Sequence, residues 1–151
     1  VFYITEDILF VHGGLSKQFL KFCPEPAELN ELATRIIRMR KWRRKSVSSL
    51  AGFIYRSQGP LWYRGRLHPG KKYPPISRED TDRLLDLSDV NRIVVGHTIC
   101  EEVSSFLDGR VIGVNVNARL NRAENKSRAL LIESGLYYLL YDAQAAGEFK
   151  P

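Results

Sequence analysis

Two histidines of this sequence stand in matching surroundings, and either could ligate a metal ion. His12 follows the apolar run Ile8–Val11 and precedes two glycines, while His97 follows the run Ile93–Val95 and Gly96. Such runs predict buried strands, and a rigid strand end can hold a ligand to the tolerance that a metal site needs. A neutral imidazole is the commonest metal ligand, but a strand-end histidine can also be a hydrogen-bonded residue of the core. The residues alone leave both interpretations open.

Arg64 is a third candidate for chemistry, and it stands in a long stretch without periodicity. Residues 46–76 contain glycines and prolines at irregular intervals, together with aromatic residues that favour an ordered conformation. An ordered connection of this length in a compact domain is usually functional. A guanidinium recognises phosphate through a planar pair of donors, whereas a loop arginine can equally be solvated. Trp62 and Tyr63, beside Arg64, are expected to pack the loop rather than to stack on a substrate.

Three motifs occur in the order that is typical of one enzyme superfamily. Residues 10–15 (FVHGGL) and 93–98 (IVVGHT) resemble the last two signature motifs of the calcineurin-like metallophosphoesterases, the phosphoprotein phosphatase superfamily. Between them, residues 59–65 (GPLWYRG) resemble the segment that the bacterial Ser/Thr-type and Shewanella-like branches place in the substrate cleft. The resemblance covers nearly the whole chain but only the C-terminal half of the family's domain. It implies an α+β fold, a four-layer β-sandwich flanked by helices, of which residues 1–151 would be the C-terminal half.

The resemblance also implies an activity. A member of this superfamily would be a metal-dependent phosphatase that hydrolyses phosphate monoesters, of a phosphoprotein or a small molecule, at a centre of two divalent metal ions (Mn, Fe or Zn). His12 and His97 would be metal ligands, and Arg64 would be the catalytic residue that binds the substrate phosphate. Two such ions clamp the phosphate, lower the pKa of a bridging water and stabilise the leaving oxygen.

The earlier motifs of the superfamily do not occur in this sequence. Gly-Asp-x-His, Gly-Asp-x-x-Asp-Arg-Gly and Gly-Asn-His-Glu are all absent. Two histidines are too few for a dinuclear site, because a hydrolytic metal ion takes three or more protein ligands. The sequence starts at Val1 rather than at a methionine. We therefore expect a missing N-terminal half of the same domain to complete the site, and we expect the isolated chain to be inactive.

The elements that must position these residues are predicted from apolar patterns and turn signals. The apolar positions of residues 27–45 predict one amphipathic helix. Ser77, with an acid three residues later, predicts the start of another. Apolar runs separated by turn residues predict one buried strand and three hairpins, at residues 92–95, 1–11, 103–116 and 127–141.

Composition and charge narrow the class of protein. The chain has 151 residues, of which 44% are hydrophobic and 26% charged, which excludes a disordered protein. No apolar run approaches the ~18 residues of a membrane span. The net charge of +6 is concentrated in one segment without acids, whose basic residues are Arg35, Arg38, Arg40, Lys41, Arg43, Arg44 and Lys45. This basic segment could be a solvated face, could attract acidic or phosphorylated substrates, or could bind nucleic acid.

Two alternatives to a phosphatase follow from these observations. A sandwich domain that has lost its metal centre would be a non-catalytic interaction module. A basic nucleic-acid-binding domain is the less favoured alternative, because no recognition motif accompanies the basic segment. For the phosphatase, the expected partners are a phosphorylated substrate and the missing N-terminal half. Nothing in the sequence assigns a compartment, and the cytoplasm is only slightly favoured over the periplasm.

Overall fold

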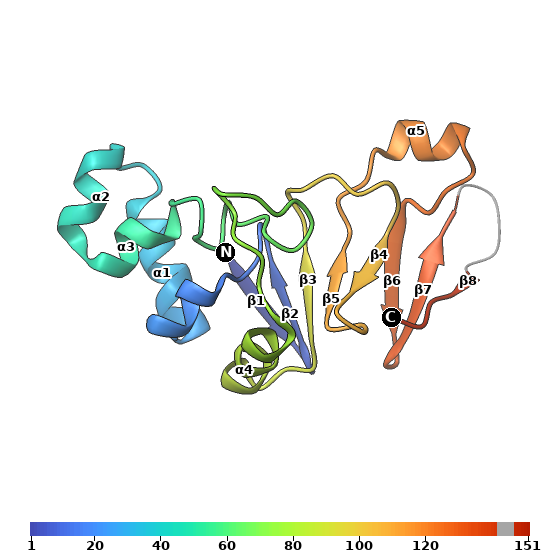
Figure 1. The fold of residues 1–151 in the computed structure, drawn as a ribbon, viewed down its shortest axis with the longest axis horizontal. Coiled ribbons are helices and arrows are strands. Elements are labelled where there is room, and N and C mark those ends of the chain that lie inside the picture. Colours follow the sequence, from blue (N-terminus) through green and yellow to red (C-terminus); the bar gives the residue numbers. More distant parts are fainter. Residues whose placement is uncertain (142–146) are drawn as a thin grey trace.

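A mixed five-stranded sheet forms the centre of the computed structural model, which describes residues 1–141 and 147–151 (Figure 1). Its strands lie in the order β1 (Phe2–Thr5), β2 (Ile8–Val11), β3 (Arg92–Val95), β5 (Val111–Gly113) and β4 (Ser104–Phe106). The three central strands are parallel, and the two edge strands are antiparallel to their neighbours. The predicted hairpins of this sheet and the strand at residues 92–95 are therefore confirmed. Because β2 and β3 are parallel neighbours, their carboxyl ends meet at the same end of the sheet.

Most of the helical structure connects β2 to β3. In chain order it consists of η1 (Lys17–Lys21), α1 (Pro26–Ile36), α2 (Lys41–Val47), α3 (Ser49–Ile54) and α4 (Arg78–Ser88), and α5 (Ala118–Ala123) follows β5. The predicted start of α4 is confirmed, since the Ser77 side chain accepts a hydrogen bond from the Asp80 N–H. Among the described residues, no helix has both the length and the apolar character that crossing a membrane requires.

The single helix predicted for residues 27–45 is wrong, because the chain turns between α1 and α2. The last carbonyls of a helix lack partners within it. Arg44, on α2, donates from Nε to the Ile36 carbonyl at 3.2 Å and from Nη2 to the Ile37 carbonyl at 3.1 Å. The arginine thus caps the end of α1 from the following helix, which a continuous helix would not allow.

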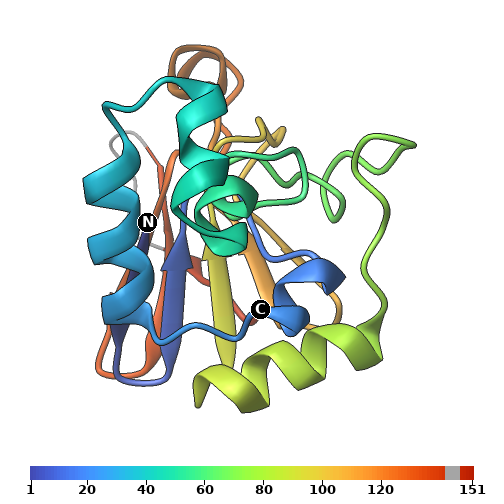
Figure 2. The same cartoon turned by 90° about the vertical axis from the view of Figure 1, so that its left-hand side faces the viewer.

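The two faces of the five-stranded sheet pack against different layers. On one face, Leu9 and Val95 belong to a core that includes residues of α1, α3 and α4, and Figure 2 looks onto these helices with the sheet behind them. On the other face, Val94 and Ile112 pack with Tyr137. Tyr137 belongs to a second, antiparallel sheet of β6 (Ala129–Glu133), β7 (Leu136–Leu140) and β8 (Gly147–Glu148). The predicted hairpin at residues 127–141 is confirmed by the pairing of β6 with β7.

The fold is a small α/β domain built on a mixed sheet, and the predicted α+β class, a four-layer β-sandwich flanked by helices, is wrong. Within the described ranges, the helices between β2 and β3 cover one face of the five-stranded sheet only. The three-stranded sheet covers the other face, and alternate residues of β6 are exposed. Alternating apolar patterns in a sequence show that a strand is covered, but they do not show whether a helix or another sheet covers it.

Candidate functional site

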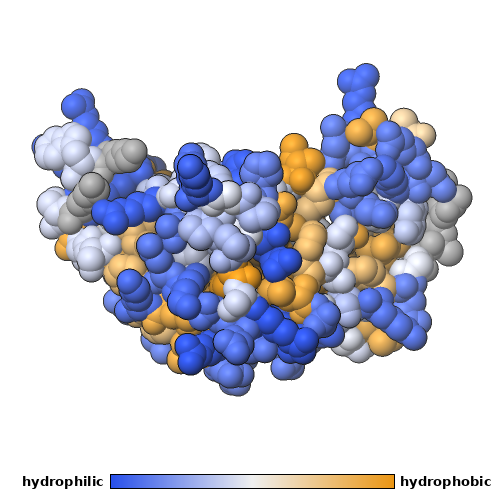
Figure 3. All heavy atoms as spheres, viewed as in Figure 1, coloured by the Kyte–Doolittle hydropathy of each residue, from blue (hydrophilic) through white to orange (hydrophobic). Residues whose placement is uncertain are grey.

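His12 and His97 meet at the carboxyl ends of β2 and β3. Val11 pairs with Val95 in the sheet, so the residues that follow each strand leave it side by side. His12 Nε2 lies 3.0 Å from His97 Nδ1, within hydrogen-bonding distance. Two ligands of one metal centre would have to converge from distant parts of the chain, and the two imidazoles do so. Figure 3 shows that the surface is hollowed on the side toward which these strands run.

Arg64 completes a chain of three side chains. Its Nη2 lies 2.8 Å from His97 Nε2, and because a guanidinium only donates, the imidazole must accept there. Burial of the ring first, and then the proximity of Arg64 and of His12, lower the pKa of His97 from its ordinary value of 6.5. The resulting neutral ring carries its proton on Nδ1 and donates it to His12 Nε2. The hydrogen bonds therefore run in one direction, from Arg64 to His97 to His12.

The loop that carries Arg64 is held directly against the residues that follow His12. The N–H groups of Gly13 and Gly14 both donate to the Pro60 carbonyl, at 2.8 and 3.2 Å. A Cβ on Gly13 would lie 2.8 Å from the Pro60 oxygen and from the Leu61 carbonyl carbon, so only glycine permits this approach. This contact explains the glycine directly after His12, whereas Gly14 has a φ of 148°. The contact also fixes Arg64 relative to the histidine pair.

Tyr63 anchors the same loop from the other side. Its ring is 2% exposed, and its hydroxyl donates to the Pro74 carbonyl at 2.6 Å. Burial raises the pKa of Tyr63 to about 12, so this hydroxyl stays protonated and remains a donor. The expected packing role of Tyr63 is confirmed.

His97 is held in an uncommon backbone conformation. Its φ is 59°, in the left-handed region that non-glycine residues rarely adopt. The Thr98 N–H donates to the Gly96 carbonyl at 2.6 Å across this turn. Strained backbone of this kind persists where the surroundings over-determine it, and it is concentrated at functional sites. Here the turn directs the imidazole of His97 toward both His12 and Arg64.

Two aromatic side chains border the three polar ones. The Trp62 ring meets the His97 ring edge-on with 5.0 Å between centroids, and 44% of Trp62 is exposed. Arg64 Cζ lies 5.8 Å from the centre of the Tyr73 ring. Trp62 was expected only to pack the loop, whereas it lies at the site. Tyr73 was not singled out from the sequence, since nothing local to residue 73 indicates that the loop returns there.

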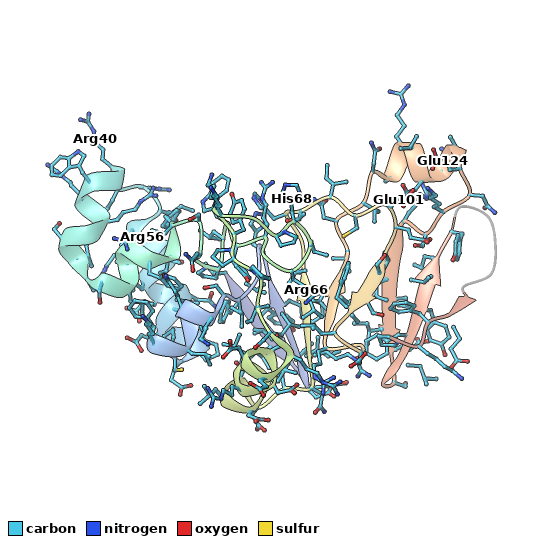
Figure 4. All side chains as sticks on the ribbon, in the orientation of Figure 1. Arg40, Arg56, Arg66, His68, Glu101 and Glu124 are labelled. Carbon is cyan, nitrogen blue, oxygen red and sulfur yellow. The ribbon has the colours of Figure 1, made fainter. Side chains whose placement is uncertain are left out.

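The expectation of two divalent metal ions (Mn, Fe or Zn) at His12 and His97 is wrong. The part of the chain that the structure describes contains no group of three or more histidine, cysteine, aspartate or glutamate side chains able to hold a metal ion. Both ring nitrogens of His97 are instead engaged, one with His12 and one with the cationic Arg64. His68, labelled in Figure 4, is exposed and lies in the loop above the sheet, as expected for a histidine outside the site.

Comparisons with known proteins show that the chain is similar to solved structures of phosphatases. No protein-family model and no curated protein matches the sequence. Similar solved structures include a cold-active protein tyrosine phosphatase from the psychrophile Shewanella sp. and a point mutant of a cold-active protein tyrosine phosphatase. A third is another structure of a cold-active protein tyrosine phosphatase. Each is 25% identical to this chain with a TM-score of 0.77, and each alignment covers 94% of this chain. The chain spans about 40% of the length of these structures.

These matches correct the family resemblance drawn from the motifs. The similar structures are described as protein tyrosine phosphatases and not as calcineurin-like metallophosphoesterases. They give no support to a missing N-terminal half of a metallophosphoesterase domain. In fold and in sequence, this chain is similar to part of a protein tyrosine phosphatase.

Proposed function

We propose that this protein is a phosphatase that hydrolyses phosphate monoesters at Arg64, His97 and His12, with a phosphoprotein as its substrate. The observation that carries the proposal is the hydrogen bond from a guanidinium to a neutral imidazole at the end of two parallel strands. Such a pair provides a fixed cation for a phosphoryl group and a proton acceptor beside it. The similarity to solved phosphatases supports the same activity.

Arg64 is the residue proposed to bind the phosphoryl oxygens. A guanidinium carries five N–H donors. Nη2 of Arg64 is engaged with His97, and the buried Nε has no hydrogen-bond partner among the described residues, so its donors are not all satisfied within this part of the chain. A phosphate monoester is a stronger acceptor for a guanidinium than a neutral imidazole is, because the hydrogen bond is then between opposite charges. Binding of the substrate would turn Arg64 from His97 toward the phosphate and leave the Nε2 lone pair of His97 free.

The freed imidazole is proposed to act as the general base that takes a proton from the attacking water. A water oxygen bonds to phosphorus as the ester P–O bond breaks, and the water loses a proton while the leaving oxygen gains one. His97 is neutral, so its Nε2 can take the proton from the attacking water. The leaving oxygen lies on the opposite side of phosphorus and takes its proton from solvent, and His97 then gives its extra proton to solvent. The products are inorganic phosphate and the alcohol or phenol of the substrate, and the protein ends with its original protons. His12 holds the ring of His97 in place by accepting from its Nδ1–H.

Aromatic phosphates are the substrates that the surroundings favour. Trp62 and Tyr73 border the polar groups, and aromatic rings pack against one another with a preference that aliphatic groups lack. The similar structures are described as protein tyrosine phosphatases, which supports phosphotyrosine as the phosphorylated residue.

The test compares kcat/KM of variants on p-nitrophenyl phosphate, a phosphotyrosine peptide and a phosphoserine peptide. Arg64→Lys should lower kcat/KM by about 100-fold or more, the typical cost of removing one donor to a developing anion. Arg83→Lys, an exposed arginine on α4, is the matched control. His12→Gln should also lower kcat/KM, whereas His68→Gln should not. Equal activity of all four variants and the wild type would contradict the proposal, as would turnover that is abolished by EDTA and restored only by a divalent ion.

A further inference from the structure

A groove of about 570 Å³ lies next to the site, and its lining is cationic and aromatic. Three basic side chains line it, Arg44, Arg56 and Lys72, together with three aromatic ones, Tyr55, Trp62 and Tyr73. Arg44 comes from α2, Arg56 and Tyr55 from the residues directly after α3, and the others from the loop that carries Arg64. Figure 4 shows Arg56 beside α3, at the end of the molecule opposite the second sheet.

Among the described residues, no carboxylate balances the charge of this groove. No carboxylate is among the residues that line it. Arg56 and Lys72 are exposed, and neither forms an ion pair in the described part of the chain. Arg44 uses Nε and Nη2 on carbonyl oxygens, and its Cζ lies 3.7 Å from the centre of the Tyr55 ring. These contacts hold the guanidinium in place but leave its positive charge uncompensated.

The groove is continuous with the proposed phosphate site. Trp62 lines the groove, and its ring lies edge-on to the His97 ring with 5.0 Å between the two ring centroids. Tyr73 also lines the groove, and its ring centre lies 5.3 Å from Lys72 Nζ and 5.8 Å from Arg64 Cζ. A substrate that places its phosphoryl group at Arg64 therefore has this groove beside it, on the side of Trp62 and Tyr73.

We propose that the groove binds acidic side chains that flank the phosphorylated residue of a phosphoprotein substrate. The inference rests on the phosphatase proposed above and specifies its substrate class, a phosphopeptide segment with glutamate or aspartate on one side of the phosphate. The three cations supply charge complementarity, which acts on encounter rate and on selection of partners. Trp62 and Tyr73 supply rigid surfaces for the peptide between the two anionic groups. Of the basic residues between Arg35 and Lys45, only Arg44 lines the groove.

The experiment measures kcat/KM on matched phosphotyrosine peptides that carry three glutamates or three glutamines on one side of the phosphotyrosine. A second pair of peptides carries the same residues on the other side. Wild type should prefer glutamate by about tenfold at low ionic strength, as expected for a few exposed ion pairs of modest strength. The preference should hold for one side only, because the groove borders the site on one side. It should decline as salt rises, because exposed charges are screened.

The variants isolate the charge of the groove. Arg56→Gln combined with Lys72→Gln should reduce the glutamate preference to about twofold. A second double variant, Arg56→Lys with Lys72→Arg, keeps both positive charges and should retain the glutamate preference of the wild type. Lys71→Gln is the matched control, since Lys71 is exposed beside Lys72 but does not line the groove. Melting temperatures of all variants exclude misfolding as the cause of a change.

The outcomes separate this inference from the phosphatase on which it rests. Binding of fluorescein-labelled peptides, followed by anisotropy, reports on the groove without turnover, whereas wild-type hydrolysis of p-nitrophenyl phosphate reports on the phosphatase alone. Hydrolysis without a glutamate preference would refute the binding role proposed for the groove but would remain consistent with the proposed phosphatase activity. Retention of the glutamate preference in the variant that combines Arg56→Gln with Lys72→Gln would also refute this binding role. A labelled single-stranded oligonucleotide that displaces the peptide and binds more tightly would assign the groove to nucleic acid instead.

Discussion

Gly13→Ala should damage both stability and activity, because Gly13 is where the loop carrying Arg64 touches the residues after His12. A Cβ at this position would lie 2.8 Å from the Pro60 oxygen and from a backbone carbon of Leu61. Ordinary contacts of a Cβ begin at 3.4 Å, so the loop must move by about 0.6 Å. The atoms it meets are backbone, and no side-chain rotation can relieve the overlap. The movement also weakens the hydrogen bond from the Gly13 N–H to the Pro60 carbonyl.

The losses of stability and of activity caused by this movement can be estimated. Overpacking of a tight contact costs about 1–3 kcal/mol, which for a chain of this size lowers the melting temperature by roughly 2–12 °C. A displacement of about 1 Å of a group that positions substrate can cost 100-fold in rate. A displacement of about 0.6 Å of Arg64 should therefore lower kcat/KM by roughly 10- to 100-fold.

The assay pairs thermal unfolding with hydrolysis of p-nitrophenyl phosphate. Gly70→Ala is the matched control, because no atom lies within 4 Å of a Cβ built at Gly70, and it should leave both quantities unchanged. If Gly13→Ala melts at the wild-type temperature and hydrolyses at the wild-type rate, the contact between the two loops does not hold Arg64, and the reasoning is wrong.

Three further predictions address the histidine pair, a helix cap and the packing of the sheets. Because the pKa of His97 is lowered below its ordinary value of 6.5, the unfolded chain takes up a proton at a higher pH than the folded chain does. Acidification through pH 6.5 and below should therefore destabilise the protein; His97→Asn should flatten this dependence in urea titrations, and His68→Asn should not. Ser77→Ala should lower the free energy of unfolding by about 1 kcal/mol through loss of the α4 cap, against less than ~0.5 kcal/mol for the exposed Ser49→Ala. Ile112→Ala, at a position that is 0% exposed between the two sheets, should cost about 2–5 kcal/mol by the same titration.

The local patterns predicted only that His12 and His97 each follow a buried strand, whereas their meeting was expected from the family resemblance, which makes both of them ligands of one metal centre. Each apolar run marks a buried strand, and the glycines beside each histidine mark the exits from those strands. If the two strands are parallel neighbours, the imidazoles must meet. Turn residues identified the hairpins for the same reason, since a turn is determined by the few residues within it.

Features that depend on distant contacts could not be predicted in this way. The break between α1 and α2 is stabilised by Arg44 reaching the carbonyls of Ile36 and Ile37, and an amphipathic pattern does not record where a helix turns back. The place of Tyr73 beside Arg64 depends on the path of a long loop. The metal role assigned to both histidines came from a resemblance of short motifs, and motifs do not show that Arg64 donates to His97.

The central claim is that Arg64 is the phosphate-binding residue of this protein, and orthophosphate, the product of the proposed reaction, tests it directly. Titration calorimetry should show that Arg64→Lys weakens orthophosphate binding by about tenfold or more, because lysine cannot reproduce the two-pronged recognition. Arg83→Lys should bind as the wild type does. Equal affinity of Arg64→Lys and the wild type for orthophosphate would contradict the account.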